Sequence, residues 1–190
     1  MKKARTFIAI SPGKKIRDRL LWLQNKFAEE GAQAKWVEHD NLHVTLLFLG
    51  EVGMVTVPQV CKAVARATEE FAPFNMTIEG VGCFPTPRRP RVLWVGVGEG
   101  REEVTAIHDA LEEPLMDLGC YRREERRYVP HLTIGRIQGN RNDGVGLEGP
   151  LEEYADWKAG EITVKEILVM GSELTRSGPI YSVLSRAKLH

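Results

Sequence analysis

The sequence predicts an α+β fold in which two halves of the chain share one plan and are related by a pseudo-two-fold axis. Two observations lead to this prediction. A strand, a helix and a further major strand follow one another twice along the 190 residues. The later strand of each half carries the same motif, histidine-apolar-threonine-apolar, beginning at His43 and again at His131. The identity between the halves is low, so the prediction depends on the order of the elements and on the matched histidines.

The first half begins with a β-prone apolar run at residues 5–10, which predicts a strand. A Ser-Pro pair and apolar residues at helical spacing then predict a helix over residues 16–27. The strong apolar run at residues 42–49 predicts a buried strand, and residues 57–71 predict a second amphipathic helix. Residues 75–79 predict another strand.

The second half repeats this order after a loop rich in Pro and Arg at residues 84–90. The remaining predicted elements are a strand over 91–97, a helix over 104–118 with Pro114 inside it, a strand opened by Pro130 that carries His131, a Gly- and Asn-rich loop over 139–149, and two further strands over 161–170 and 179–184.

The composition excludes several classes of protein. Hydrophobic residues make up 43% of the chain and charged residues 27%, which is ordinary for a globular domain and excludes disorder as the main description. No run of about 18 apolar residues exists, so no membrane span is expected. The apolar run near the N-terminus is too short for a signal peptide. Cys61, Cys83 and Cys120 are odd in number and widely spaced, which argues against a disulfide framework and favours a reduced, cytoplasmic location.

Basic and acidic residues number 26 each, so the formal net charge is zero. A protein that coats duplex nucleic acid usually has a strong basic excess, which is absent here. Local clusters of arginine remain, at Arg88, Arg89 and Arg91 and at Arg122, Arg123, Arg126 and Arg127. These clusters have two interpretations: a solvated surface with internal ion pairs, or a small patch that holds one or a few phosphates.

The two histidine-threonine pairs carry the chemistry. Residues i and i+2 of a strand point to the same face, so His43 and Thr45 project together, as do His131 and Thr133. The pseudo-symmetry brings the two pairs face to face across a cleft. Two histidines supply a proton acceptor and a proton donor near neutral pH, and two threonine hydroxyls donate hydrogen bonds to anionic oxygens. A phosphodiester fits this set of groups.

The sequence gives weaker support to other kinds of site than to a phosphodiester site. Two histidines without a cysteine or carboxylate nearby make a poor metal site, and their spacing is not that of helical zinc ligands. No Gly-x-Ser-x-Gly motif exists, which disfavours a serine hydrolase. The glycine-rich residues 96–100 lack the full dinucleotide or P-loop pattern and are interpreted as a turn between a strand and a helix.

The paired motifs resemble those of the 2H phosphoesterase superfamily. The flanking residues 5–10, 41–50, 90–96 and 130–136 resemble the bacterial and archaeal RNA 2′,3′-cyclic phosphodiesterases, which were earlier named 2′-5′ RNA ligases. The segment Ser172-Glu173-Leu174, with Gly178 and Tyr181, resembles the closing segment of that family. The likeness covers nearly the whole chain, in the order found in the family.

The resemblance implies that residues 1–190 form a single domain of two intertwined lobes, bilobal, with two antiparallel sheets flanking a central cleft and helices outside. It implies hydrolysis of a terminal 2′,3′-cyclic phosphate on RNA to a 2′-phosphate, with no cofactor and no metal. By the same resemblance, His43 is expected to protonate the departing 3′ oxygen and His131 to activate water, while Thr45, Thr133 and Arg136 bind the phosphate. The expected partners are RNA ends or oligonucleotides with a cyclic phosphate, and neither a membrane nor a stable protein partner is expected.

The position of Arg136 remains open at this point. In a regular strand, its side chain points away from the face that carries His131 and Thr133. Either the strand ends or bulges near Gly135, or Arg136 acts from the rim, or it is a surface arginine. His39, His108 and His190 are expected outside the site. Trp36, Trp94 and Phe48 are able to stack a base, although packing in the core is favoured for Trp94 and Phe48.

Two alternative functions stay open. The domain is either an enzyme or a module that binds a nucleotide or an RNA end without significant turnover, and the intact His-Thr pairs disfavour the latter. A 2′-5′ RNA ligase would use the same site in the reverse direction. The sequence does not separate the two directions of one reversible reaction.

Overall fold

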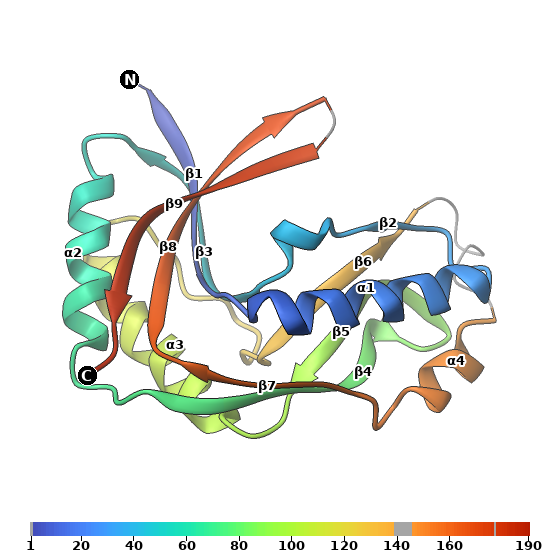
Figure 1. Ribbon diagram of the computed structural model, residues 1–190. Helices are drawn as coiled ribbons and strands as arrows, with labels where there is room; N and C mark the ends of the chain where they lie inside the picture. Colours follow the sequence, from blue (N-terminus) through green and yellow to red (C-terminus); the bar gives the residue numbers. More distant parts are fainter. Residues whose placement is uncertain (1, 139–145, 177) are drawn as a thin grey trace.

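The computed structural model describes residues 2–138, 146–176 and 178–190 (Figure 1). In the first half of the chain, the elements are β1 (Lys3–Ile10), α1 (Gly13–Glu29), β2 (Ala34–Trp36), the short 3-10 helix η1 (His39–Asn41), β3 (Val44–Gly53), α2 (Val57–Thr68) and β4 (Phe74–Thr86). In the second half, they are β5 (Arg89–Val97), α3 (Arg101–Asp117), β6 (His131–Ile137), α4 (Glu148–Glu153), β7 (Lys158–Val164), β8 (Glu166–Thr175) and β9 (Gly178–Lys188). The predicted α+β class is confirmed.

The strands form one curled antiparallel sheet in the order β7-β4-β5-β6-β3-β1-β8-β9, with β2 paired to β6. In the described part of the chain, β3 and β6 pair only at Val44 and Leu132. The sheet therefore consists of a first sheet group (β3, β1, β8 and β9) and a second sheet group (β7, β4, β5, β6 and β2). These groups correspond to the two sheets that the family resemblance implied, and one strand residue pair joins them in the described part of the chain.

The helices cover the outside of the two sheet groups. Helices α2 and α3 pack on the first sheet group, where α2 contacts β8 and β9 and α3 contacts β3. Helix α1 contacts β6 and β7, and α4 contacts β4, both in the second sheet group. In Figure 1, α1 crosses the front of the molecule while α2 and α3 lie together at the left. The first half of the chain thus supplies a helix to the second sheet group, and the second half supplies a helix to the first. That residues 1–190 act as a single domain stays a prediction.

Apolar stripes at helical spacing fasten these helices to the sheet. The buried residues of α1 include Ile16, Leu20, Leu23 and Phe27, and those of α3 include Val104, Ile107, Leu111 and Leu115. Burying one such side chain stabilises the fold by about 1.5–3 kcal/mol, so each stripe contributes several kcal/mol before the entropy of ordering is counted. The helices therefore hold both sheet groups, and the strands that carry the histidines, in fixed positions.

Three predicted segments differ from the structure. Residues 84–90 form the end of a β-hairpin rather than a loop, because Phe84 pairs with Val92 and Pro85 with Pro90. Residues 161–170 are not one strand, since β7 pairs with β4 and β8 pairs with β1, so the chain crosses between the sheet groups at Lys165. The predicted loop 139–149 ends in α4, and its residues 139–145 lie outside the described ranges.

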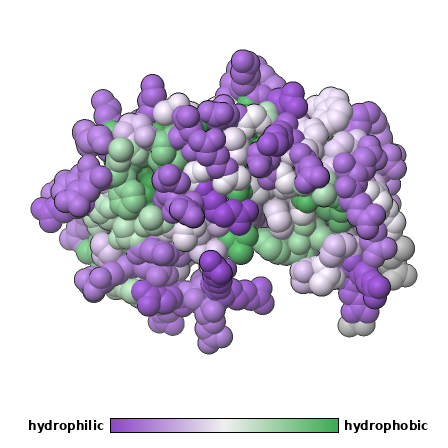
Figure 2. All heavy atoms as spheres, turned by 90° about the horizontal axis from the view of Figure 1, so that it is seen from below, coloured by the Kyte–Doolittle hydropathy of each residue, from purple (hydrophilic) through white to green (hydrophobic). Residues whose placement is uncertain are grey.

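The outer surface is mainly polar. Figure 2 shows the face seen from below, where polar side chains project outward and smaller apolar areas lie between them. Across the residues that the structure describes, no helix has the length and apolar character needed to cross a membrane.

Candidate active site

The two predicted motifs meet where the two sheet groups join. Val44 and Leu132 form the pair that links β3 to β6, and both side chains are fully buried. In an antiparallel pair, the residues on either side face each other in reverse order, which places His43 beside Thr133 and Thr45 beside His131. The two histidines then occupy diagonal positions, whose separation is about 7–8 Å. All four side chains share the face opposite Val44 and Leu132.

Each histidine is held by the same hydrogen bond. The Nδ1 atom of His43 lies 2.6 Å from the carbonyl oxygen of Asn41, and Nδ1 of His131 lies 2.7 Å from that of Val129. Each carbonyl belongs to the residue two positions earlier in the chain. Because a carbonyl oxygen only accepts, Nδ1 carries the hydrogen in both rings. The Nε2 atom of each ring is therefore left to accept a proton when the ring is neutral, or to donate one when it is charged.

Aromatic rings surround both histidines. His43 packs against Phe7 and Tyr181, with ring centroids 4.8 and 5.5 Å away. His131 packs against Phe84 and Trp94, at 5.1 and 6.1 Å. The two imidazoles thus have matched apolar surroundings in the two halves.

These surroundings shift the acid-base properties of the rings. Burial lowers the pKa of His43, and the charges of Arg17 and His131 lower it further, against the opposing effect of the bond to Asn41. Burial also lowers the pKa of His131, opposed by the bond to Val129 and reinforced by Arg136. Both rings therefore favour the neutral form more than an exposed histidine does.

Most of the predicted site residues line one pocket of about 510 Å³. Its lining includes His43, Thr45, Thr133 and Arg136, together with the cations Arg5 and Lys35 and residues of the β8–β9 hairpin, namely Ser172, Leu174, Gly178 and Tyr181. We call this space the first pocket. His131 lines an adjoining second pocket, and Thr45 and Phe48 line both. The five predicted residues therefore lie around two neighbouring pockets that share Thr45 and Phe48 in their linings.

A bulge in β6 brings Arg136 to the site. Trp94 pairs with Thr133 and the preceding Leu93 pairs with Gly135, so Ile134 has no partner on β5. Its carbonyl oxygen instead accepts hydrogen bonds from the backbone nitrogen of Val37 and the side chain of Gln24. One extra residue reverses the alternation of side chains, which turns Arg136 toward the face of Thr133. Of the three possibilities left open by the sequence, the structure shows the bulge.

Phe48 occupies the corresponding position in the first half, three residues after the threonine. Ala9 pairs with Thr45 and Ile8 with Leu47, so Leu46 is the extra residue in β3. Phe48 is 48% exposed and lines both pockets. The expectation that Phe48 packs in the core was wrong, because it assumed an unbroken alternation along the strand.

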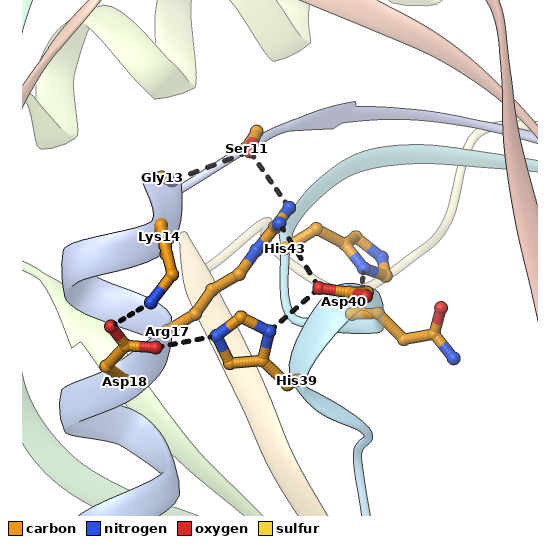
Figure 3. A network of polar contacts seen from close by, with 9 residues as sticks. Ser11, Gly13, Lys14, Arg17, Asp18, His39, Asp40 and His43 are labelled. Carbon is orange, nitrogen blue, oxygen red and sulfur yellow. Dashed lines mark hydrogen bonds and ion pairs between the residues drawn. The ribbon is translucent and has the colours of Figure 1, made fainter.

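A polar network lies behind His43 (Figure 3). Arg17 of α1 donates to the Ser11 hydroxyl and lies 4.0 Å from the carboxylate of Asp40. His39 contacts Asp40 through Nδ1 at 2.7 Å and Asp18 of α1 through Nε2 at 2.9 Å. The network therefore fastens η1 to α1. Since η1 ends at Asn41, which holds His43, the network supports the position of that ring.

The remaining histidine and tryptophan expectations have mixed outcomes. His108, which was expected outside the site, is buried, stacks on Tyr128 at 4.0 Å and lines the second pocket with His131, because the chain before β6 folds over α3. Trp36 lines the first pocket, and a Cβ atom at Gly135 would approach its ring to 2.7 Å. Glycine at this position therefore lets Trp36 lie against β6.

The described residues contain no group of three or more histidine, cysteine or acidic side chains placed to hold a metal ion. Independence from metal stays a prediction, as does the cytoplasmic location.

A duplicated α+β fold with a His-x-Thr pair on the joining strand of each half defines the class of 2H phosphoesterases. A family model described as LigT-like phosphoesterase matches the chain twice, at residues 10–94 and 95–181. The double match confirms the predicted duplication. The chain belongs to the LigT-like phosphoesterase family.

Relatives and solved structures agree with this assignment. The RNA 2′,3′-cyclic phosphodiesterase of Methanothermobacter thermautotrophicus is 37% identical over 180 residues, covering 95% of this chain and 96% of that protein. The protein of the same name from Aeropyrum pernix is 39% identical over 170 residues, covering 90% and 94%. The crystal structure of TT0787 from Thermus thermophilus superposes with a TM-score of 0.78 at 25% identity, covering 97% of each chain. That of E. coli LigT with 3′-AMP has a TM-score of 0.77 at 24% identity, covering 99% of each.

Proposed function

We propose that the protein hydrolyses terminal 2′,3′-cyclic phosphates of RNA to 2′-phosphomonoesters, through His43 and His131 and without a metal ion. The observation that carries the proposal is the matched pair of imidazoles, each with Nδ1 bonded to a backbone carbonyl and Nε2 left for proton transfer. The names of the relatives supply the substrate class.

Hydrolysis then proceeds by one in-line displacement. Nε2 of neutral His131 removes a proton from water as the water oxygen forms a bond to phosphorus. The bond between phosphorus and the 3′ oxygen breaks, and Nε2–H of protonated His43 gives its proton to that oxygen. The 2′ oxygen keeps the phosphate, and the two histidines end in exchanged protonation states. The donor and acceptor roles follow the family resemblance, whereas the need for one of each follows from the reaction.

The groups around the histidines bind the phosphate in this proposal. Thr45 and Thr133 lie beside the imidazoles, and their hydroxyls donate to the nonbridging oxygens. Arg136 supplies a charged donor from the same face, because the bulge at Ile134 turns it inward. Arg5 and Lys35 line the same pocket and add positive charge that attracts an anionic substrate.

Product analysis tests the proposal. An RNA that ends in a 2′,3′-cyclic phosphate is incubated with the protein in EDTA, and the expected product is a 2′-phosphate end. His43→Ala and His131→Ala are each expected to lower turnover about 10²–10⁴-fold, the usual effect of removing a positioned proton-transfer group. His190→Ala is the matched control, since this exposed residue lines neither pocket. Near wild-type turnover by His131→Ala refutes the acid-base role, and binding without turnover by the wild type supports a binding module instead.

A further inference from the structure

One carboxylate faces the otherwise cationic first pocket. Among the residues that the structure describes, Glu38 is the only acidic side chain in its lining, which also contains the cations Arg5, Lys35 and Arg136. Glu38 is exposed and forms no ion pair with any described residue. A carboxylate opposes the binding of a phosphate in the same pocket. Its position there favours a ligand that also donates hydrogen bonds to it.

The carboxylate lies on the His43 side of the first pocket. Glu38 directly precedes η1, and its carbonyl oxygen accepts a hydrogen bond from the backbone nitrogen of Asn41, the residue that holds His43. A Cβ atom at Gly178, where β9 begins, would lie 3.6 Å from Oε1 of Glu38. The Asn41 side chain donates to the carbonyl oxygen of Pro179 at 3.0 Å, which fastens η1 to the β8–β9 hairpin. The carboxylate is therefore held between η1 and this hairpin.

The proposed reaction places the nucleoside on the same side. In an in-line displacement, the attacking water lies opposite the departing 3′ oxygen. His131 activates the water from the second pocket, and His43 protonates the 3′ oxygen from the first. The ribose and its base therefore occupy the first pocket, which has the size of a site for a small organic ligand. The rings of Trp36 and Tyr181 line this pocket and offer faces on which a base can stack.

The four bases differ in how many hydrogen bonds they donate to one carboxylate. Guanine presents N1–H and an N2 amino hydrogen side by side on its Watson–Crick edge, so both carboxylate oxygens accept at once. Adenine and cytosine present one amino group and uracil presents one N3–H, each next to an acceptor atom. The second carboxylate oxygen then meets an acceptor instead of a donor. Since paired hydrogen bonds to a charged group are among the strongest, the carboxylate fits guanine best.

We propose that Glu38 selects guanosine as the nucleoside that carries the cyclic phosphate, by accepting hydrogen bonds from N1 and N2 of guanine. The inference rests on the proposed function, because that function places the nucleoside in the first pocket. It narrows the substrate from RNA ends in general to ends whose last nucleoside is guanosine.

Binding of the reaction products tests this preference without turnover. Isothermal titration calorimetry compares the dissociation constants of the 2′-phosphates of guanosine, adenosine, cytidine and uridine. The wild type is expected to bind guanosine 2′-phosphate about tenfold more tightly than each of the others, the effect of one further hydrogen bond to a charged group. Inosine 2′-phosphate lacks only the N2 amino group of guanine, so its affinity is expected to fall to that of the other three.

Variants locate the effect. Glu38→Gln is expected to weaken the binding of guanosine 2′-phosphate about tenfold, because one of the two acceptors and the charge are lost. The other three nucleotides are expected to bind equally well or more tightly, since the repulsion of their phosphate is removed. Glu173→Gln removes the same charge from an exposed position of β8 that lines neither pocket, and this control is expected to keep the preference.

Two results overturn the inference. One is a wild type that binds the four nucleotides equally or prefers another base, which needs no variant. The other is a Glu38→Gln protein that keeps the full preference for guanosine 2′-phosphate. If the wild type prefers guanosine 2′-phosphate but hydrolyses no cyclic phosphate, the proposed function fails and the base selection stands. If it hydrolyses the four nucleoside 2′,3′-cyclic phosphates with equal kcat/KM and binds their products equally, the proposed function stands and the base selection fails.

Discussion

The pH dependence of kcat/KM is the most direct test of the two histidines. In the proposed mechanism, the active form of the free protein has neutral His131 and protonated His43, so kcat/KM has an acidic and an alkaline limb. Both rings interact electrostatically, and the limbs report macroscopic values of the pair. Because burial lowers the pKa of both imidazoles below the ordinary 6.5, the maximum is expected below pH 6.5.

The steepness of the alkaline limb follows from the lowered pKa of His43. As pH rises through the lowered pKa of His43, the protonated fraction of the acid falls tenfold for each further pH unit. With both pKa values at or below 6.5, kcat/KM is expected to drop about 25- to 100-fold between pH 6.5 and pH 8.5, because the neutral fraction of His131 rises at most twofold over this range. The assay is initial-rate hydrolysis of a nucleoside 2′,3′-cyclic phosphate, whose own charge does not change over this range.

Variants assign the limbs. His43→Ala is expected to lose the alkaline limb, because no acid remains to deprotonate, and His131→Ala is expected to lose the acidic limb. An optimum above pH 7.5 in the wild type refutes the reasoning about burial. An alkaline limb that persists in His43→Ala, with the acidic limb missing, keeps the mechanism and exchanges the two roles.

Three further predictions concern metal, packing and phosphate binding. Hydrolysis is expected to continue in EDTA, and a loss that one divalent ion restores contradicts the metal-free mechanism. Gly135→Ala is expected to cost about 1–3 kcal/mol and several degrees in Tm by calorimetry, because the new Cβ lies 2.7 Å from the ring of Trp36, whereas Gly149→Ala, with open space around it, serves as the neutral control. Arg136→Ala is expected to raise KM about tenfold with a smaller change in kcat, and a change confined to kcat counts against a role in phosphate binding.

The sequence predicts the His-Thr faces correctly because two residues of alternation suffice to place His43 with Thr45 and His131 with Thr133. The sequence does not predict on which face the side chains after Thr45 and Thr133 lie. A bulge reverses the alternation there, and it forms only when the strand is paired with its neighbour. The bulge in β3 nevertheless leaves a trace. Leu46 and Leu47 are consecutive and both buried, which an unbroken strand facing a cleft on one side does not produce.

The path of the chain between the sheet groups is also absent from the sequence pattern. Residues 161–170 alternate only as far as Lys165 and then change to an apolar run, but the different partners of the two parts, β4 and β1, appear only in the tertiary pairing. The same holds for the second pocket. Each arginine cluster is visible as a run of charge, but their meeting beside His131 depends on the position that β5 and the segment before β6 take in the folded sheet.

The site lies at a narrow junction between the two sheet groups. Besides the pair of Val44 with Leu132, the hydroxyl of half-buried Tyr128 donates to the carbonyl oxygen of Thr45 at 2.7 Å, which ties the segment before β6 to β3. In the proposed binding mode, a phosphate held by Thr45 and Thr133 would bridge this junction and add contacts between two sheet groups that share one strand pair. Product at a hundred times its Kd is then expected to stabilise the folded protein by about 2.7 kcal/mol, and slower hydrogen exchange is expected first at the amides of this junction.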